Sequence, residues 1–234
     1  LCAGGAGPVS RPLLFSRGFS KEDTVRMVQL DEELLSTPVA VYFDRGAVNA
    51  RRGGGSLGFQ AFGIRRKTTA GTTKGCFHSK LCLALVDAGE GEEALVVGVL
   101  SANLTESGHW TNVECAWLDE VAAGGLCSYH GDIMGVLSAI REEARVFQSR
   151  HEALEHILKF MRGVDQAQQR TQDGWFQARL FYGQGDQGFA DFLREELRLP
   201  AGIYHLEIIS PFFDDGAALR ALHKALAPKS TRVY

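Results

Sequence analysis

The sequence predicts an α/β fold in which helices flank a mixed β-sheet, and three observations support that prediction. Short apolar runs typical of buried strands recur along the chain, at 39–44, 57–67, 77–86 and 94–100. Apolar residues at helical spacing fill three segments, 21–35, 133–147 and 151–161. Beyond residue 175, strand-like and helical segments alternate, an order that favours an α/β lobe.

Polar residues mark where the helical segments start. Ser20 can cap the first and Asp132 the second, because a short polar side chain there accepts a hydrogen bond from the first turn. His151 and His156 flank the apolar face of the third segment, so we expect both to face solvent. Residues 1–20 contain Gly, Pro and Ser without any period, which predicts a loop or a poorly anchored terminus.

The composition is that of a globular protein without a membrane partner. Apolar residues make up 45% and charged residues 23%, and no apolar run approaches the ~20 residues that a membrane-spanning helix needs. The net charge of -3 does not by itself indicate nucleic acid as a partner. Five cysteines match no zinc spacing and read as reduced thiols, so we expect a cytoplasmic protein; they stand at positions 2, 76, 82, 115 and 127.

The chain is expected to contain two lobes. Residues 1–165 make the first, residues 166–174 form a linker rich in Gln and Asp, and residues 175–234 begin the second. The sequence starts with Leu rather than Met and stops inside an expected strand. We therefore expect a fragment of a longer protein, with a truncated second lobe and possibly additional domains elsewhere in that chain.

A central apolar run from Phe77 to Val86 carries two polar residues, His78 and Lys80. Strand side chains alternate, so residues two apart point to the same side. An imidazole and an ammonium on one face of a buried strand need a reason, because burying an unpaired charge is costly. For a His-x-Lys pair alone, the plainer interpretation is that the strand emerges into solvent there.

Two downstream segments make the pair more informative. The apolar run 94–100 leads directly into Ser101-Ala102-Asn103, and the segment 112–118 places Glu114 among apolar neighbours. Singly, Asn103 could be a turn residue and Glu114 could be half-exposed on an edge strand. The order of the five polar residues is what makes the pattern specific: His78, Lys80, Ser101, Asn103 and Glu114.

This order resembles the phospholipase D superfamily of phosphodiesterases. The resemblance covers about residues 39–120 and, loosely, the second lobe; Ser101 to Gly108 followed by Asn112-Val113-Glu114 is most similar to the nuclease-type and tyrosyl-DNA phosphodiesterase-like branches. One position departs from the fuller motif of the superfamily, which has Asp five residues after the Lys, where this chain has Leu85. The tyrosyl-DNA phosphodiesterase branch also lacks that Asp, and Asp87 is expected to belong to a hairpin.

The resemblance implies a phospholipase D-like sandwich and a role for each residue. His78 would be the nucleophile that forms a phosphohistidine, and Lys80 would meet the phosphate oxygens as they gain charge. Asn103 would donate to the same oxygens, Ser101 would donate or simply pack, and Glu114 would orient an imidazole. No cofactor is expected and no metal, since the sequence shows no cluster of ligating residues.

The expected function is therefore a phosphodiester hydrolase with nucleic acid as its partner, a nuclease or an enzyme that processes DNA or RNA ends. Two alternatives stay open: a phospholipid-directed phosphodiesterase, and a catalytically inactive nucleic-acid-binding module. The Gly-x-Gly-x-x-Gly at 183–188 also matches a dinucleotide site, but no ribose-binding acid ends the next strand. No second His-x-Lys occurs, so the chain holds half of the expected site. Substrate, cleavage polarity and oligomeric state are not indicated.

Overall fold

The computed structural model divides the chain into two compact units, residues 1–180 and 181–234. The predicted helix at 21–35 and the predicted linker beyond Gln166, to residue 174, lie outside the described residues. None of the described helices is long and apolar enough to cross a membrane. The structure describes residues 9–16, 39–44, 59–64, 77–103, 113–144, 151–166, 178–183, 188–197, 205–208 and 216–233.

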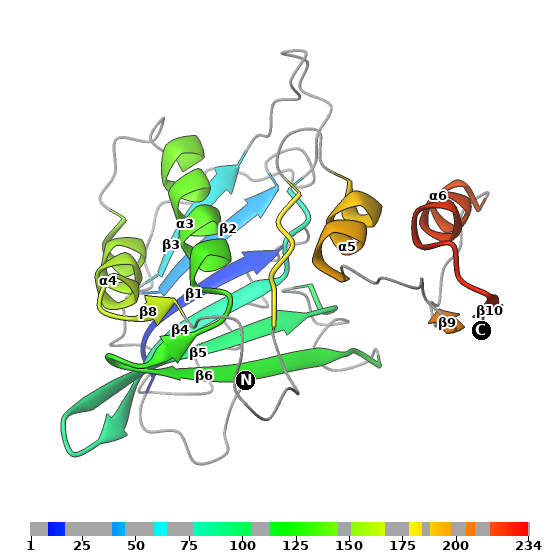
Figure 1. Ribbon diagram of the computed structural model, residues 1–234. Helices are drawn as coiled ribbons and strands as arrows, with labels where there is room; N and C mark the ends of the chain where they lie inside the picture. The colour runs from blue at the N-terminus through cyan, green and yellow to red at the C-terminus, as the bar shows by residue number, and fades with distance from the viewer. Residues whose placement is uncertain are drawn as a thin grey trace. The chain divides into compact units, whose positions relative to one another are not determined.

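A mixed sheet of six strands forms the first unit, in the order β3-β2-β1-β4-β5-β6 (Figure 1). The first three strands run parallel to one another, whereas β4, β5 and β6 form an antiparallel meander attached to β1. The strands are β1 (Val9–Ser16), β2 (Val39–Asp44), β3 (Phe59–Ile64), β4 (Leu81–Gly89), β5 (Glu92–Leu100) and β6 (Ala116–Ala122). The predicted α/β class with a mixed sheet is confirmed.

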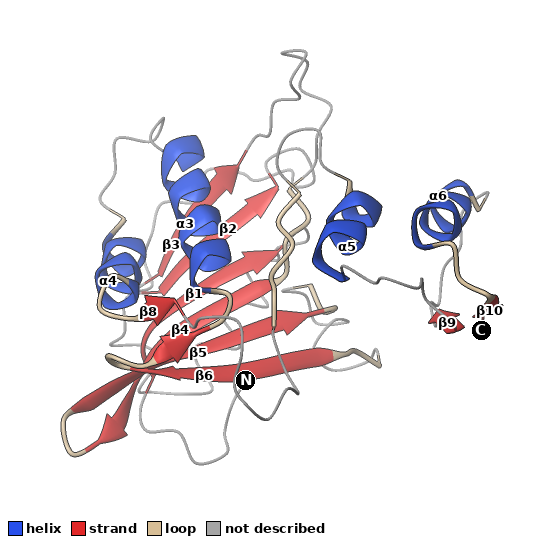
Figure 2. Cartoon of the chain, viewed as in Figure 1, coloured by secondary structure: helices blue, strands red, loops and turns tan. Residues whose placement is uncertain are grey.

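Two helices, α3 (His130–Ala144) and α4 (Glu152–Met161), lie over one face of this sheet (Figures 1 and 2). The short strands β7 (Leu126–Cys127) and β8 (Asp165–Gln166) pair beside them. Each fully buried aliphatic side chain stabilises the fold by about 1.5–3 kcal/mol. The aliphatic side chains that expose no surface come from both layers: Val41, Ile64, Leu83, Leu95, Val97, Ile133, Leu137, Ile140, Leu154 and Ile157.

The loop predicted for residues 1–20 is wrong over its described part, residues 9–16, because β1 occupies the middle of the sheet between β2 and β4. A proline removes a ladder hydrogen bond and is tolerated where pairing is incomplete. Pro12 pairs with Ala84 of β4, and the pairing with β2 begins one residue later, at Leu13. Pairing with two distant strands, rather than a local period, makes this segment a strand.

Two predicted element starts are also wrong. The strand expected from Phe77 begins at Leu81, so His78 and Lys80 precede it; the ladder reaches back only to the Lys80 carbonyl, which accepts from Leu100 N at 2.9 Å. Helix α3 begins at His130, so Asp132 lies in its first turn rather than at its cap.

Asp132 instead holds the end of the first unit. Its carboxylate accepts two bonds from the Arg179 guanidinium, at 2.9 and 3.0 Å, and one from Leu180 N at 2.9 Å. Ser128 Oγ donates to Ala178 O at 3.1 Å. The strand expected at 175–182 is therefore wrong over its described part, because side chains rather than a neighbouring strand bond this backbone.

His151 does not face solvent as predicted. Its Nδ1 lies 3.0 Å from Tyr42 Oη, and its ring centroid lies 4.2 Å from that of Phe62. Burial, followed by the charge of Glu155, raises the pKa of Tyr42 above its usual 10.0. His151 thus packs the start of α4 against β2 and β3.

The second unit alternates helix and strand as predicted: α5 (Phe189–Leu197), β9 (His205–Ile208), α6 (Ala217–Leu226) and β10 (Ser230–Val233). Strands β9 and β10 pair in parallel, and α5 contacts α6. Three aromatic rings, those of Phe181, Phe189 and Phe192, cluster with centroids 5.1 to 6.5 Å apart.

Candidate functional site

The five predicted site residues lie at one end of the six-stranded sheet. The register places the end of β1 beside the end of β2, and Leu14 of β1 beside Cys82 near the start of β4. The same end holds the last residue of β5, Leu100, which faces Ala116 at the start of β6. In open α/β sheets, ligands bind outside the carboxyl ends of the parallel strands.

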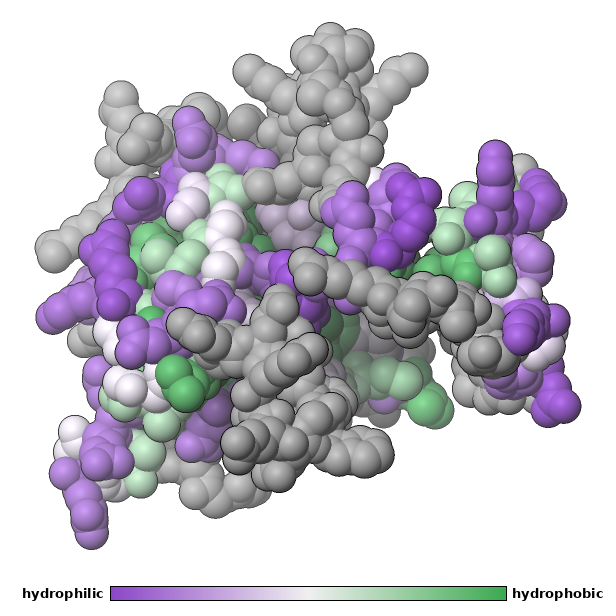
Figure 3. Space-filling model, viewed as in Figure 1, coloured by the Kyte–Doolittle hydropathy of each residue, from purple (hydrophilic) through white to green (hydrophobic). Residues whose placement is uncertain are grey.

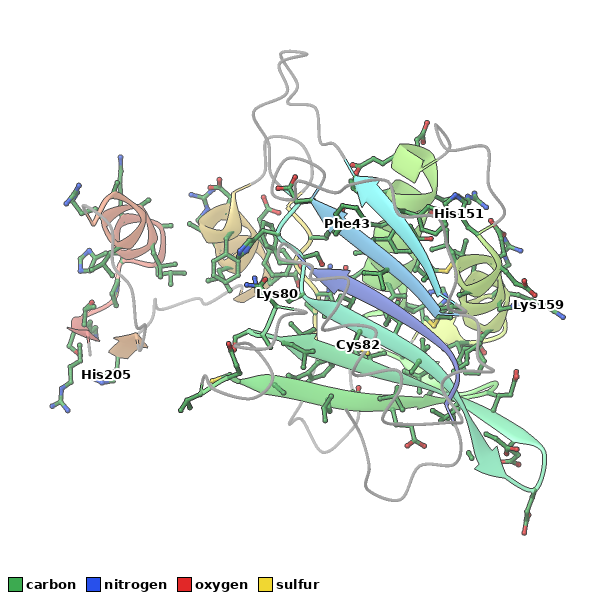
Figure 4. All side chains as sticks on the ribbon, turned by 180° about the vertical axis from the view of Figure 1, so that it is seen from behind. Phe43, Lys80, Cys82, His151, Lys159 and His205 are labelled. Atoms are coloured by element: carbon green, nitrogen blue, oxygen red, sulfur yellow. The ribbon has the colours of Figure 1, made fainter. Side chains whose placement is uncertain are left out.

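Figure 4 shows this arrangement from behind, with Lys80 at the start of β4 and Phe43 near the end of β2. His78 and Lys80 therefore precede β4, Ser101 and Asn103 follow β5, and Glu114 precedes β6. Three chain segments that are separate in sequence bring their polar residues to the carboxyl ends of the parallel strands.

His78 and Lys80 contact each other. Lys80 Nζ lies 3.1 Å from His78 Nε2 and 3.2 Å from Nδ1, with the imidazole exposed and the lysine half-buried. An ammonium can only donate, so the ring nitrogen that accepts from it must carry a lone pair. The contact therefore favours the neutral imidazole, which is the nucleophilic form.

Ser101 and Glu114 form a second pair. The Ser101 hydroxyl donates to Glu114 Oε2 and accepts from Cys115 N at 2.8 Å, while Ser101 N donates to Cys115 O at 2.9 Å. Ser101 was expected either to donate to a phosphate oxygen or simply to pack, and these contacts correspond to packing. The serine joins the end of β5 to the start of β6 and fixes the Glu114 carboxylate.

One backbone bond, from Leu100 N to Lys80 O, ties the two pairs together. Regular alternation up to this bond puts Lys80 on the face of Cys82, and puts Ser101 on the opposite face, that of Leu81 and Val99. Both segments leave strand geometry at these residues, so alternation no longer fixes the directions of His78 and Asn103. Asn103 lies half-buried two residues beyond Ser101.

Asp44 was not singled out by sequence analysis. It ends β2 at the same end of the sheet. Its side chain is 7% exposed, and among the described residues it is the charged one that is buried. Buried carboxylates are rare unless partnered. The signal in the sequence is an acidic residue directly after an apolar strand, which is also the pattern of an ordinary strand end.

The start of β6 is braced from the helix layer. Tyr129, directly before α3, donates to Asp119 Oδ2 at 2.6 Å, and its ring meets that of Trp117 edge to face at 5.5 Å. Burial, reinforced by the bond to Asp119, raises the pKa of Tyr129 well above 10.0. Burial also raises the pKa of the nearby Cys127 thiol.

The arrangement offers an imidazole in contact with a cation, and a carboxylate that accepts from Ser101, all at the carboxyl ends of the parallel strands. Together these can attack phosphorus, balance the charge of its oxygens and orient a partner group. Within the part of the chain that the structure describes, no group of three or more His, Cys, Asp or Glu side chains is placed to hold a metal ion.

Two comparisons with known proteins returned nothing: no protein-family model matches the chain, and no curated protein matches it.

Proposed function

We propose that this chain is the histidine-bearing lobe of a phospholipase D-type phosphodiesterase that cleaves nucleic acid through a covalent phosphohistidine at His78. The supporting observation is the contact of Lys80 Nζ with the His78 ring at 3.1 Å, at the carboxyl ends of the parallel strands. The proposal includes the fold of that superfamily, the phospholipase D-like sandwich. The mixed sheet with helices over one face is compatible with this fold.

The first step forms a bond between a His78 nitrogen and phosphorus, and breaks the bond from phosphorus to the leaving oxygen. Lys80 and Asn103 donate to the non-bridging oxygens, whose charge grows in the transition state. The leaving oxygen needs a proton. Because the chain has a single His-x-Lys, a second one must supply that acid, either in a longer chain or in another copy.

In the second step, water attacks phosphorus, the bond from nitrogen to phosphorus breaks, and His78 is regenerated. That water needs a general base, which would again be the second histidine. The isolated chain should therefore stall at the covalent intermediate whenever the leaving group departs without a proton.

The p-nitrophenyl ester of thymidine 5′-phosphate provides such a leaving group. We expect the chain to release about one p-nitrophenolate per molecule and then stop, with the nucleotide attached to His78 in a mass spectrum. His78→Asn should abolish both signals, whereas the matched His205→Asn, on an exposed histidine of β9, should leave them unchanged. A metal chelator should have no effect.

Other outcomes would contradict the proposal in distinct ways. Release that stops with chelator and returns with magnesium would indicate a metal-dependent nuclease. Sustained turnover by the monomer, lost in His78→Asn, would show that the second motif is dispensable. A faster burst from the p-nitrophenyl ester of a phosphatidic acid in vesicles would favour the phospholipid alternative, and no adduct on any ester would favour an inactive binding module.

A further inference from the structure

The last described segment of the chain, residues 216–233, differs in charge from the rest. It holds four basic residues and no acidic one: Arg220, Lys224, Lys229 and Arg232. The whole chain has 25 basic and 28 acidic residues, for a net charge of -3. A local cluster of one sign on a protein of the other sign acts on charged partners directly, because salt screens the distant charges.

Helix α6 separates its basic residues from its leucines. At about 100° per residue, Leu219, Leu222 and Leu226 share an arc of about 60°, while Arg220 and Lys224 lie on the opposite side. The leucines are buried or half-buried and the two cations are exposed. Figure 4 shows nitrogen-tipped side chains extending from α6 and from the strand after it. The basic residues thus face away from the core of the unit.

The backbone leaves room for the guanidinium of Arg220. Gly216, directly before α6, has φ +78°, and a Cβ atom there would lie 3.2 Å from Arg220 Nη1. Exposed Lys229 follows the helix, whereas Arg232 lies in β10, in register with Glu207 of β9. We define the α6 basic surface as Arg220, Lys224 and Lys229.

The apolar residues of α6 favour nucleic acid over a membrane as the partner. A helix that binds the membrane surface inserts large apolar residues into the lipid. Among the described side chains of α6, the exposed apolar ones are the alanines Ala217 and Ala221, whereas the leucines are buried or half-buried. A cationic helix face that exposes no large apolar side chain cannot insert into lipid, but it can bind a hydrated phosphate backbone, to which arginine and lysine both donate.

We infer that the α6 basic surface binds the sugar–phosphate backbone of a nucleic-acid strand. The choice of nucleic acid rests on the proposed function, but the charge and geometry of the surface do not. Such contacts hold a strand without reading its sequence.

Binding of a fluorescein-labelled single-stranded DNA 20-mer, followed by anisotropy at several salt concentrations, tests this surface. The double variant Arg220→Glu/Lys224→Glu should bind roughly 10- to 100-fold more weakly at low salt. Each phosphate contact contributes about 0.7 to the slope of log affinity against log salt for single strands, so the slope should fall by about 1.4. The matched control Lys159→Glu/Arg162→Glu makes the same charge change at exposed positions of α4 and just after it, and should change affinity less than about threefold.

Equal losses in both variants would overturn the inference, because they would show an effect of net charge alone. Unchanged affinity would overturn it as well, and so would tighter binding to phosphatidylserine vesicles than to DNA. If the adduct forms at His78 but DNA binding does not depend on the α6 basic surface, the inference about this surface alone is wrong. If DNA binding depends on the α6 basic surface but no adduct forms, the catalytic proposal alone is wrong.

Discussion

The two ends of the β4–β5 ladder carry different chemistry although the same two strands supply both. At the hairpin end stand four exposed acidic residues, Asp87, Glu90, Glu92 and Glu93. Hydrophilic residues gather at this tip in Figure 3, at the lower left. At the other end lie His78 and Lys80 before β4 and Ser101 after β5.

The difference lies in what the polar side chains bond to. At the hairpin end, Asp87 Oδ1 accepts from Gly89 N at 2.8 Å, and Gly89, Glu90 and Gly91 turn the chain with φ of 96°, 55° and 80°. Asp87 therefore belongs to the hairpin, as predicted. At the site end, Lys80 contacts another side chain and Ser101 reaches a segment 13 residues away. At the hairpin end the carboxylate of Asp87 bonds local backbone and shapes a turn. At the other end Lys80 contacts the side chain of its near neighbour His78, and Ser101 joins two strands.

The largest expected effect is at Lys80. Lys80→Ala should slow the p-nitrophenolate burst by about 10²- to 10³-fold, because one fixed donor to the developing charge is lost. The nucleotide should still attach to His78, since the nucleophile remains. Stopped-flow absorbance measures the rate. Glu92→Gln at the hairpin end is the control, and a slowing beyond about twofold there would contradict the contrast between the two ends.

Next comes the pair that joins β5 to β6. Ser101→Ala removes the donor to Glu114 and the acceptor of Cys115 N, so the free energy of unfolding should fall by about 1–3 kcal/mol in urea titrations. Ser128→Ala is a matched control, since within the described residues that hydroxyl makes one hydrogen bond, to Ala178 O. A loss below about 0.5 kcal/mol for Ser101→Ala would show that the serine does not hold the strands together.

A smaller effect is expected from Tyr129, which braces β6 between the two ends. Its folded pKa is raised above the unfolded value of 10.0, so the folded state keeps a proton that the unfolded chain releases at higher pH. The stabilisation is complete below pH 10 and should be lost above it, by about 1.4 kcal/mol per pH unit. Tyr129→Phe should flatten this alkaline slope in urea titrations. An unchanged slope would assign the loss to other groups, including Tyr42.

The smallest expected effect is at the hairpin itself. Asp87→Ala should lower the free energy of unfolding by about 0.5–1.5 kcal/mol, because Gly89 N loses its acceptor but remains open to water. The burst at His78 should not change. A slower burst in this variant would mean that the turn sets the geometry of the far end of the ladder.

The sequence analysis succeeded where local pattern decides structure. The apolar runs of β4 and β5 and the face of α4 follow from periodicity alone. It failed where a partner far along the chain decides, as for β1, for His151 beneath Tyr42 at a separation of 109 residues, and for Asp132 with Arg179 at 47. The roles of the five site residues come from the resemblance and remain predictions.

The anchoring of the first unit's last residues by Asp132 has a consequence for proteolysis. Trypsin cleaves after arginine, and it must first draw the residues around the bond into an extended strand. At Arg179–Leu180 this requires breaking three hydrogen bonds to one half-buried carboxylate. The bond should therefore survive limited digestion although it lies beside the boundary between the two units. Asp132→Asn weakens the hold on Arg179 and should make this bond an early site of cleavage.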